Sequence, residues 1–376
     1  MSETDIYRNL QRHLDTHPVG YPQTKGGVEI RLLKHFFTPQ EAKMATKLSY
    51  KDTSLGKIYE SVEKEGLSVA ETENLLDQMV KKGIIGYRER SGVKSYRNMP
   101  LIVGMYEGQI NKLTPEFLTD MEQYTFSTTF GLEFVGSGIS QMRTIPIEES
   151  VTPDYAIATY DGIMAILDKT EGPFSIMNCI CRQAAQVRGR ECKKTSRLET
   201  CLAIEDFAVQ VIKMGVGREV TREEAIRITK KNEEEGLVLQ PENVQKPEFL
   251  CACCGCCCGM LRVLKNLPRP LDYWSTNYYA RCETESCTGC GKCVKICPLS
   301  ALKIHKENKV SVIDMNRCIG CGVCVPSCPT KARSLAKREK YAVPPDNHDH
   351  LLETIMNNKK GKLGKLKVAA KMLLRL

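Results

Sequence analysis

The feature that most constrains this chain is a pair of cysteine runs in its last third, each with the spacing C-x2-C-x2-C-x3-C-P. The first run, CTGCGKCVKICP, contains Cys287, Cys290, Cys293 and Cys297. The second run, CIGCGVCVPSCP, contains Cys318, Cys321, Cys324 and Cys328. Three thiolates in so tight a loop can surround three corners of one compact centre, and the glycines between them allow backbone N–H groups to turn toward the sulfurs. Each run is therefore expected to wrap around a metal centre.

This spacing is typical of the bacterial two-cluster ferredoxins, in which the fourth cysteine of each run binds the other cluster. One [4Fe–4S] cluster is expected on Cys287, Cys290, Cys293 and Cys328. The second is expected on Cys318, Cys321, Cys324 and Cys297. Structural zinc is the alternative, because C-x2-C also suits zinc, but zinc favours paired knuckles over three evenly spaced cysteines. Neither cluster has an open coordination position, so the pair predicts a relay of single electrons.

Whether the other cysteines form disulfides or bind metal depends on the compartment that the chain is expected to occupy. The chain has 376 residues and 19 cysteines, an odd number that a full set of disulfides would not give. Its start, MSETDIYRNLQRHLD, lacks the apolar core of a secretory signal, and no stretch approaches 18 apolar residues. We therefore expect a reducing cytoplasm, where disulfides do not persist and cysteines serve as metal ligands or redox groups.

A third set of cysteines has the spacing C-x-C-x10-C-x8-C and consists of Cys179, Cys181, Cys192 and Cys201. FSIMNCICR alternates as a strand does, and a strand over residues 176–181 would direct Cys179 and Cys181 to one face. Basic residues follow from Arg182 onward and would lower thiolate pKa values and offset cluster charge. The segment predicts a third [4Fe–4S] cluster, with zinc and separate buried thiols as the alternatives.

The stretch CACCGCCCG places six cysteines in eight positions, namely Cys251, Cys253, Cys254, Cys256, Cys257 and Cys258. They cannot all pair locally as disulfides without strain, and six exposed thiols would oxidise. Four of them are expected to hold a fourth [4Fe–4S] cluster, and the sequence does not say which four. A larger cluster on five or six of them, or zinc, stays open. Cys282 lies outside every pattern and is expected to be structural or a spare ligand.

One part of this stretch has a second resemblance. Cys253-Cys254-Gly255 resembles the CCG element of heterodisulfide-reductase-type subunits, which carry unusual clusters. A C-x2-C follows at Cys287 and Cys290, but the ferredoxin pattern already accounts for those two cysteines. Only one CCG is present, and the surrounding residues do not match. The resemblance keeps open a catalytic reductase subunit with an unusual cluster at residues 251–258.

The N-terminal part predicts helices followed by a hairpin. VEIRLLKHFF repeats apolar residues at spacings of three and four. Two capping boxes, Thr38 to Glu41 and Ser68 to Glu71, predict the starts of two further helices. IIGYRER and VKSYR, separated by Ser91-Gly92, predict a two-stranded hairpin. Helices followed by a hairpin predict a winged helix.

A family resemblance supports this interpretation. LLKHFFTPQEA, LLDQMVKKGII and MPLIVGMYEGQ are similar to the winged-helix front end of a family of anaerobic iron–sulfur proteins that end in a ferredoxin module. CICRQ, SRLETCLAIEDFA, EEGLVLQPENVQ and CACCGCCCGMLR also resemble that family, so the likeness runs from about residue 28 to residue 330. The resemblance implies a cluster-binding segment at residues 251–258.

The expected fold class is a multidomain α+β protein with an N-terminal winged helix, a mixed α/β iron–sulfur middle region and a C-terminal two-cluster ferredoxin-like module. The expected divisions are a polar arm at 1–23, a winged helix at 24–110, a cysteine-rich middle domain at 111–267, a ferredoxin domain at 268–335, and a linker with a basic amphipathic helix at 336–376.

A winged helix raises the possibility of DNA binding, which requires a positive face. The would-be recognition helix instead carries Glu71, Glu73 and Asp77. The wing is basic, with Arg88, Arg90, Lys94 and Arg97. A scaffold that docks a protein partner is therefore favoured, and a redox-sensing DNA-binding regulator is the alternative.

The C-terminal tail, KKGKLGKLKVAAKMLLRL, carries the clearest surface signal. Its apolar residues near one helical face are Leu363, Leu366, Ala370, Leu373 and Leu374. Residues 359–376 thus predict a basic amphipathic helix that can lie on an anionic membrane surface, with a partner-docking helix as the alternative. The net charge of +9 says little, because each cluster with four thiolates contributes about −2.

Together these patterns predict a non-catalytic iron–sulfur subunit that relays single electrons between a redox enzyme and another carrier in anaerobic metabolism. The expected partners are redox proteins, within an oxidoreductase complex, and nucleic acid is less expected. The expected location is the cytoplasm, including the inner face of the membrane if the tail binds lipid.

Overall fold

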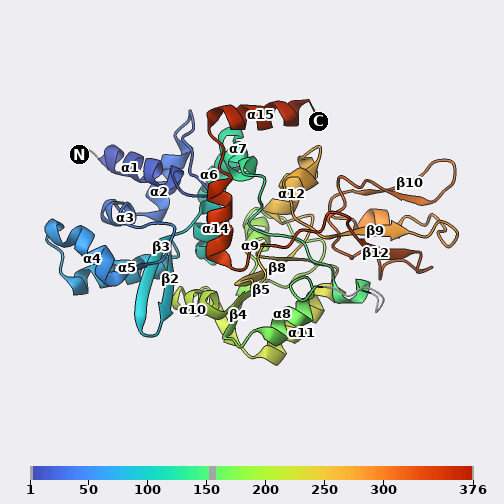
Figure 1. Ribbon diagram of the computed structural model, residues 1–376, viewed down its shortest axis with the longest axis horizontal. Helices are drawn as coiled ribbons and strands as arrows, with labels where there is room; N and C mark the ends of the chain where they lie inside the picture. Colours follow the sequence, from blue (N-terminus) through green and yellow to red (C-terminus); the bar gives the residue numbers. More distant parts are fainter. Residues whose placement is uncertain (1–2, 152–157, 375–376) are drawn as a thin grey trace. The chain divides into compact units, whose positions relative to one another are not determined.

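The computed structural model describes residues 3–151 and 158–374. The chain divides into two compact units, and each is described by itself. The first unit comprises Met1–Ser137, Asp206–Glu219 and Leu352–Ala369. The second unit comprises Gly138–Glu205, Val220–Leu351 and Ala370–Leu376. The architecture mixes helices with several small sheets (Figure 1).

The first unit opens with three helices, α1 (Glu3–Asp15), α2 (Val28–Phe36) and α3 (Pro39–Ala45). Residues 1–23 were predicted to form a polar arm, but they contain α1, and residues 1–2 lie outside the described residues. The reason is a stripe of buried apolar side chains at helical spacing, which packs α1 against α2 and α3: Ile6, Tyr7, Leu10 and Leu14.

A small sheet follows these helices. The elements are β1 (Thr53–Ser54), α4 (Leu55–Val62), η1 (Glu63–Glu65), α5 (Val69–Lys82), β2 (Ile85–Arg90) and β3 (Val93–Asn98). The strands pair antiparallel in the order β1-β3-β2. The hairpin turn at Ser91-Gly92 is confirmed, and both residues have positive φ, as a tight turn between twisted strands requires.

The capping boxes predicted from the sequence are also confirmed. Thr38 accepts from the Glu41 backbone at the start of α3, and Ser68 does the same with Glu71 at the start of α5. Helix α5 ends at Gly83, which adopts the left-handed conformation that terminates helices. Local capping chemistry therefore sets the ends of these helices.

The rest of the first unit is helical apart from most of β6 (Gly217–Val220). Its further elements are η2 (Leu101–Met105), η3 (Glu107–Gln109), α6 (Pro115–Thr125) and α7 (Thr128–Gly136), and most of α10 (Glu205–Lys213), α14 (His348–Asn357) and α15 (Lys362–Leu373). Among the described helices, none is both long and apolar enough to cross a membrane.

The second unit is built on a sheet in which its strands have the order β4-β5-β8-β7. These strands are β4 (Phe174–Asn178), β5 (Glu199–Ile204), β7 (Val238–Pro241) and β8 (Phe249–Cys253). The associated helices are η4 (Glu148–Ser150), α8 (Ile163–Lys169), α9 (Ile180–Val187), α11 (Arg222–Glu234) and α12 (Gly259–Asn266). Helix α11 packs on β4, β5 and β7.

The cysteine-rich C-terminal part of the second unit consists of short elements (Figure 1). They are η5 (Pro270–Asp272), β9 (Tyr278–Cys282), α13 (Lys292–Ile296), β10 (Leu302–Ile304), β11 (Ser311–Ile313) and β12 (Arg333–Lys337). β9 pairs antiparallel with β12, and β10 with β11. Its small core combines three cysteines with a few apolar side chains: Ala280, Cys293, Ala301, Leu302, Cys318, Cys324 and Leu335.

Candidate metal centres

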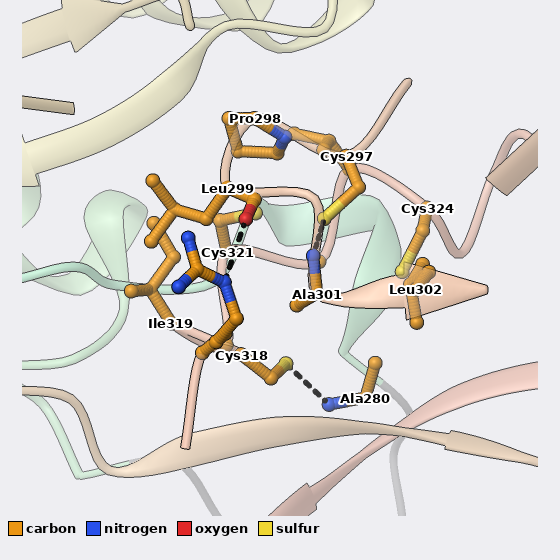
Figure 2. A pocket seen from close by; sticks show the side chains of 14 residues that line it. Ala280, Cys297, Pro298, Leu299, Ala301, Leu302, Cys318, Ile319, Cys321 and Cys324 are labelled. Carbon is orange, nitrogen blue, oxygen red and sulfur yellow. Dashed lines mark hydrogen bonds between the residues drawn. The ribbon is translucent and has the colours of Figure 1, made fainter. Parts of the chain in front are cut away.

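The cysteines of the two runs surround two cavities. The outer cavity is lined by Cys287, Cys290, Cys293 and Cys328, so three residues come from the first run and one from the second. The inner cavity is lined by Cys297, Cys318, Cys321 and Cys324, the reverse combination (Figure 2). The grouping within each cavity is the crossed one expected for two-cluster ferredoxins.

The two cavities differ in exposure. Cys290 in the outer cavity is exposed, and Cys287 and Cys328 are half-buried. Three of the four cysteines of the inner cavity are buried, each less than a tenth exposed: Cys318, Cys321 and Cys324. The outer cavity therefore lies nearer to solvent than the inner one.

Backbone amides point at the sulfurs, as cluster thiolates require. Ala301 N–H donates to Cys297 Sγ over 3.2 Å, and Ala280 N–H donates to Cys318 Sγ over 3.3 Å (Figure 2). In the outer cavity, Ser311 N–H donates to Cys287 Sγ over 3.4 Å. Such donors stabilise negative sulfur and tune cluster potentials.

Glycines make these tight loops possible. Gly289 has φ +65°, and a Cβ there would lie 1.9 Å from the carbonyl oxygen of Lys309. Gly320 has φ +62°, and a Cβ there would lie 2.3 Å from the carbonyl oxygen of Tyr278. Only glycine combines this conformation with so close a backbone approach.

The charges around the cavities favour an anionic guest. Burial raises the pKa of Cys324 to about 12, so a proton must leave when this thiol binds iron. The side chain of Arg333 is buried, lines the outer cavity and donates to Cys293 Sγ over 3.6 Å. Burial alone would lower the pKa of Arg333, but the charges of nearby cysteines raise it. A buried cation beside buried thiols fits a group that carries negative charge.

These two cavities define an iron–sulfur protein. Residues 286–332 match the family model of a 4Fe-4S dicluster domain. The chain binds [4Fe–4S] clusters, because the donor set, the amides and the buried cation all suit them. No curated protein sequence matches the chain.

The ten cysteines of the middle region form two further groups in the second unit. Six of them are linked by contacts between neighbouring thiols, which we call the six-cysteine ring: Cys179, Cys181, Cys258, Cys253, Cys251 and Cys201. The other four, which we call the Cys192 quartet, are Cys192, Cys254, Cys256 and Cys257.

Strand register explains much of the six-cysteine ring. β5 and β8 are antiparallel with Leu202 opposite Leu250, so Cys201 and Cys251 are also adjacent across the pair. Side chains alternate along a strand, which puts Cys251 and Cys253 on the same face of β8. Cys254 follows the end of β8 and leaves that alternation.

Two helix starts complete the six-cysteine ring. Cys179 is the N-cap of α9, and Cys258 is the N-cap of α12. Contacts from neighbouring thiols, together with backbone donors at these helix starts, hold the pKa of both residues well below the usual cysteine value. Positive helix ends favour thiolates, so this group is suited to bind metal.

The strand predicted over residues 176–181 is shorter than expected. β4 ends at Asn178, where the register with β5 shifts, and α9 begins at Ile180. Cys179 and Cys181 are therefore brought together by a helix start rather than by strand alternation.

The structure also groups the cysteines differently from the sequence-based sets. Cys192, predicted to join Cys179, Cys181 and Cys201, lies with three cysteines of the CACCGCCCG stretch instead. Its sulfur is 3.6 Å from Cys254 Sγ and 3.8 Å from Cys256 Sγ. Cys282 adjoins Cys287 of the outer cavity.

Arg182 is buried between the two middle groups. Its guanidinium donates to Thr200 Oγ1 over 2.5 Å and to the Ala252 carbonyl over 2.9 Å. Burial alone would lower its pKa, but the charges of Cys179, Cys254 and Cys201 raise it above the usual value. A fully buried guanidinium needs negative partners, and thiolates supply them.

Sequence reasoning captured part of this environment. The cluster of basic residues after Cys181 predicted positive charge near the thiols, and Arg182 fulfils that role. Arg197, from the same cluster, pairs with Glu235 over 2.8 Å instead. The contact of Arg333 with Cys293 was missed, and only its position five residues after Cys328, the last cysteine of the second run, could have indicated it.

Proposed function

We propose that the chain is an electron-transfer subunit that relays single electrons between a redox enzyme and another carrier in anaerobic metabolism, without substrate chemistry of its own. The observation that carries this proposal is the pair of crossed, cysteine-lined cavities, one exposed and one buried. An exposed centre exchanges electrons with a partner, and a buried one passes them inward.

The proposal assigns the ligands by cavity. One [4Fe–4S] cluster is held by the four cysteines of the outer cavity and the other by the four of the inner cavity. Because Cys297 follows α13, which carries Cys293, a single short helix links ligands of both clusters. That link supports rapid exchange between two nearby one-electron centres.

The six-cysteine ring extends the relay. We propose a third iron–sulfur cluster on the six-cysteine ring. A Cβ on Gly255 would lie 3.0 Å from the Pro298 carbonyl oxygen, so the loop after β8 touches the residue that follows Cys297. Cys258 of the six-cysteine ring belongs to the same loop, so this contact supports a path from the outer cavity through the inner one to the ring.

For the N-terminal elements we propose a winged helix that docks a protein partner. Helices α3, α4 and α5 are followed by the antiparallel hairpin β2-β3, and β1 joins the hairpin in a three-stranded sheet, an arrangement that supports this fold. The basic residues of the hairpin have acidic neighbours in the same unit: Arg97 pairs with Asp52, Arg90 with Asp206, and Lys94 with Glu73. Charges that are neutralised internally contribute little to phosphate binding, so a protein partner in an oxidoreductase complex is favoured over DNA.

The C-terminal tail is proposed as a peripheral contact with an anionic membrane surface. Leu363 and Leu366 on α15 and Leu374 just after it are strongly exposed, at 78%, 64% and 67%. Lysines interleave these leucines, the composition that interfacial helices use. Arg375 and Leu376 of the predicted segment lie outside the described residues.

The relay is tested on the full chain purified without oxygen. Redox titration followed by EPR is expected to show one-electron steps from at least two [4Fe–4S] centres, and stopped-flow mixing with reduced viologen is expected to show rapid uptake of electrons. C290S is expected to alter only the signal of the exposed cluster. If the wild-type chain, with its clusters intact, takes up electrons no faster than the C290S variant, the relay is refuted.

A further inference from the structure

The Cys192 quartet is more compact than any other potential metal site in the described part of the chain. Its four sulfurs all lie within 4.8 Å of one another. The individual separations are 3.4 Å for Cys256 to Cys254, 3.6 Å for Cys192 to Cys254, and 3.8 Å for both Cys192 to Cys256 and Cys257 to Cys256.

These separations are those of ligands that share one ion. Four thiolates around one tetrahedral zinc, with Zn–S bonds of about 2.3 Å, have sulfurs separated by about 3.8 Å. In a cubane each thiolate binds a different iron at its own corner, so the sulfurs lie farther apart. The compact geometry therefore fits a single ion better than a cluster.

The same structure supplies an internal comparison. The four sulfurs of the outer cavity and the four of the inner cavity belong to the matched dicluster domain. Within the described residues, neither set meets the 4.8 Å limit that the Cys192 quartet meets. The six-cysteine ring does not meet it either. The Cys192 quartet thus differs in kind from the sites assigned to clusters.

The surroundings of the quartet resemble those of a closed structural site. Cys254 and Cys257 are buried, and Cys192 and Cys256 are half-buried. Backbone N–H groups of Thr195 and Lys194 donate to the sulfur of Cys192, which stabilises a thiolate there. Four thiol ligands leave no open position, which is typical of structural rather than catalytic zinc.

We propose that the Cys192 quartet binds one metal ion in a tetrahedral four-thiolate site, and that the ion is zinc. The site joins the loop between α9 and β5 to the loop after β8, two segments 62 residues apart. It acts as a structural clamp that holds these two loops together. The proposal is independent of the electron relay, since it assigns this site no redox role.

The test measures zinc, iron and acid-labile sulfide in the full chain, expressed with zinc and iron and purified without oxygen. Wild type is expected to hold about one zinc per chain. C192S and C256S are expected to lose that zinc and keep their iron and sulfide. C290S is the matched control, because Cys290 belongs to the outer cavity and not to the quartet, and it is expected to keep the zinc.

A measurement without substitution guards against variants that fail to fold. Zinc K-edge absorption of the wild-type chain is expected to show four sulfur ligands at about 2.3 Å. Loss of one iron without sulfide in C192S would show a single-ion site and overturn the assignment of zinc. Loss of about four irons and four sulfides would indicate a cubane and overturn the proposal. Wild-type protein with neither bound zinc nor a sulfide-free iron would also overturn it.

Discussion

Replacing Arg333 by glutamine is expected to lower the reduction potential of the cluster in the outer cavity. The guanidinium of Arg333 is buried and lies 3.6 Å from Cys293 Sγ. Reduction adds a negative charge to the cluster, and a nearby positive charge stabilises that state. Removing the charge therefore makes reduction harder, so the potential becomes more negative.

The size of the shift follows from Coulomb's law. Two unit charges about 6 Å apart at an effective dielectric constant of about 20 interact by roughly 3 kcal/mol. Residual solvent screening reduces this to about 1.5–3 kcal/mol. A tenfold change in a one-electron equilibrium corresponds to about 59 mV, so the expected shift is about 60–130 mV.

The assay is an EPR-monitored redox titration of the anaerobic full chain. R333K keeps the charge and is expected to shift the potential far less than R333Q. K306Q removes an exposed lysine of the same module and is expected to shift it by roughly 10 mV or less, because solvent screens that charge. Equal shifts in R333Q and R333K, or none in either, would refute the electrostatic argument.

Three further predictions follow from other parts of the molecule. G289A is expected to lose iron from the outer cavity, because a Cβ there would meet the Lys309 carbonyl at 1.9 Å, and full iron content would contradict this. Burial lowers the pKa of His17 to about 3. The unfolded chain therefore takes up a proton below pH about 6.5 and the folded chain does not, so the free energy of unfolding should fall by a few kcal/mol as the pH drops from 6.5 toward 3. H17Q should flatten this dependence in denaturant titrations, and an unchanged slope would contradict it. Sedimentation with vesicles containing anionic lipid should pull down wild type but less of L366D, and equal binding would remove the membrane role of the tail.

Local sequence determined the parts of this protein whose contacts are close along the chain. The ferredoxin spacing defines three ligands of each cluster within seven residues, so the pattern predicted both cavities before any tertiary contact was known. The capping boxes at Thr38 and Ser68 and the turn at Ser91-Gly92 were predictable for the same reason.

The tertiary structure decided how the ten middle cysteines divide. Cys192 joins Cys254 across 62 residues, and no local spacing encodes such a contact. Cys251 and Cys253 separate from Cys254 because the first two share a face of β8 and the third begins a loop. Strand register and the ends of secondary structure elements, which depend on packing across the sheet, therefore decide which sulfurs meet. The composition of CACCGCCCG predicts metal binding, and only the fold distributes its cysteines between two groups.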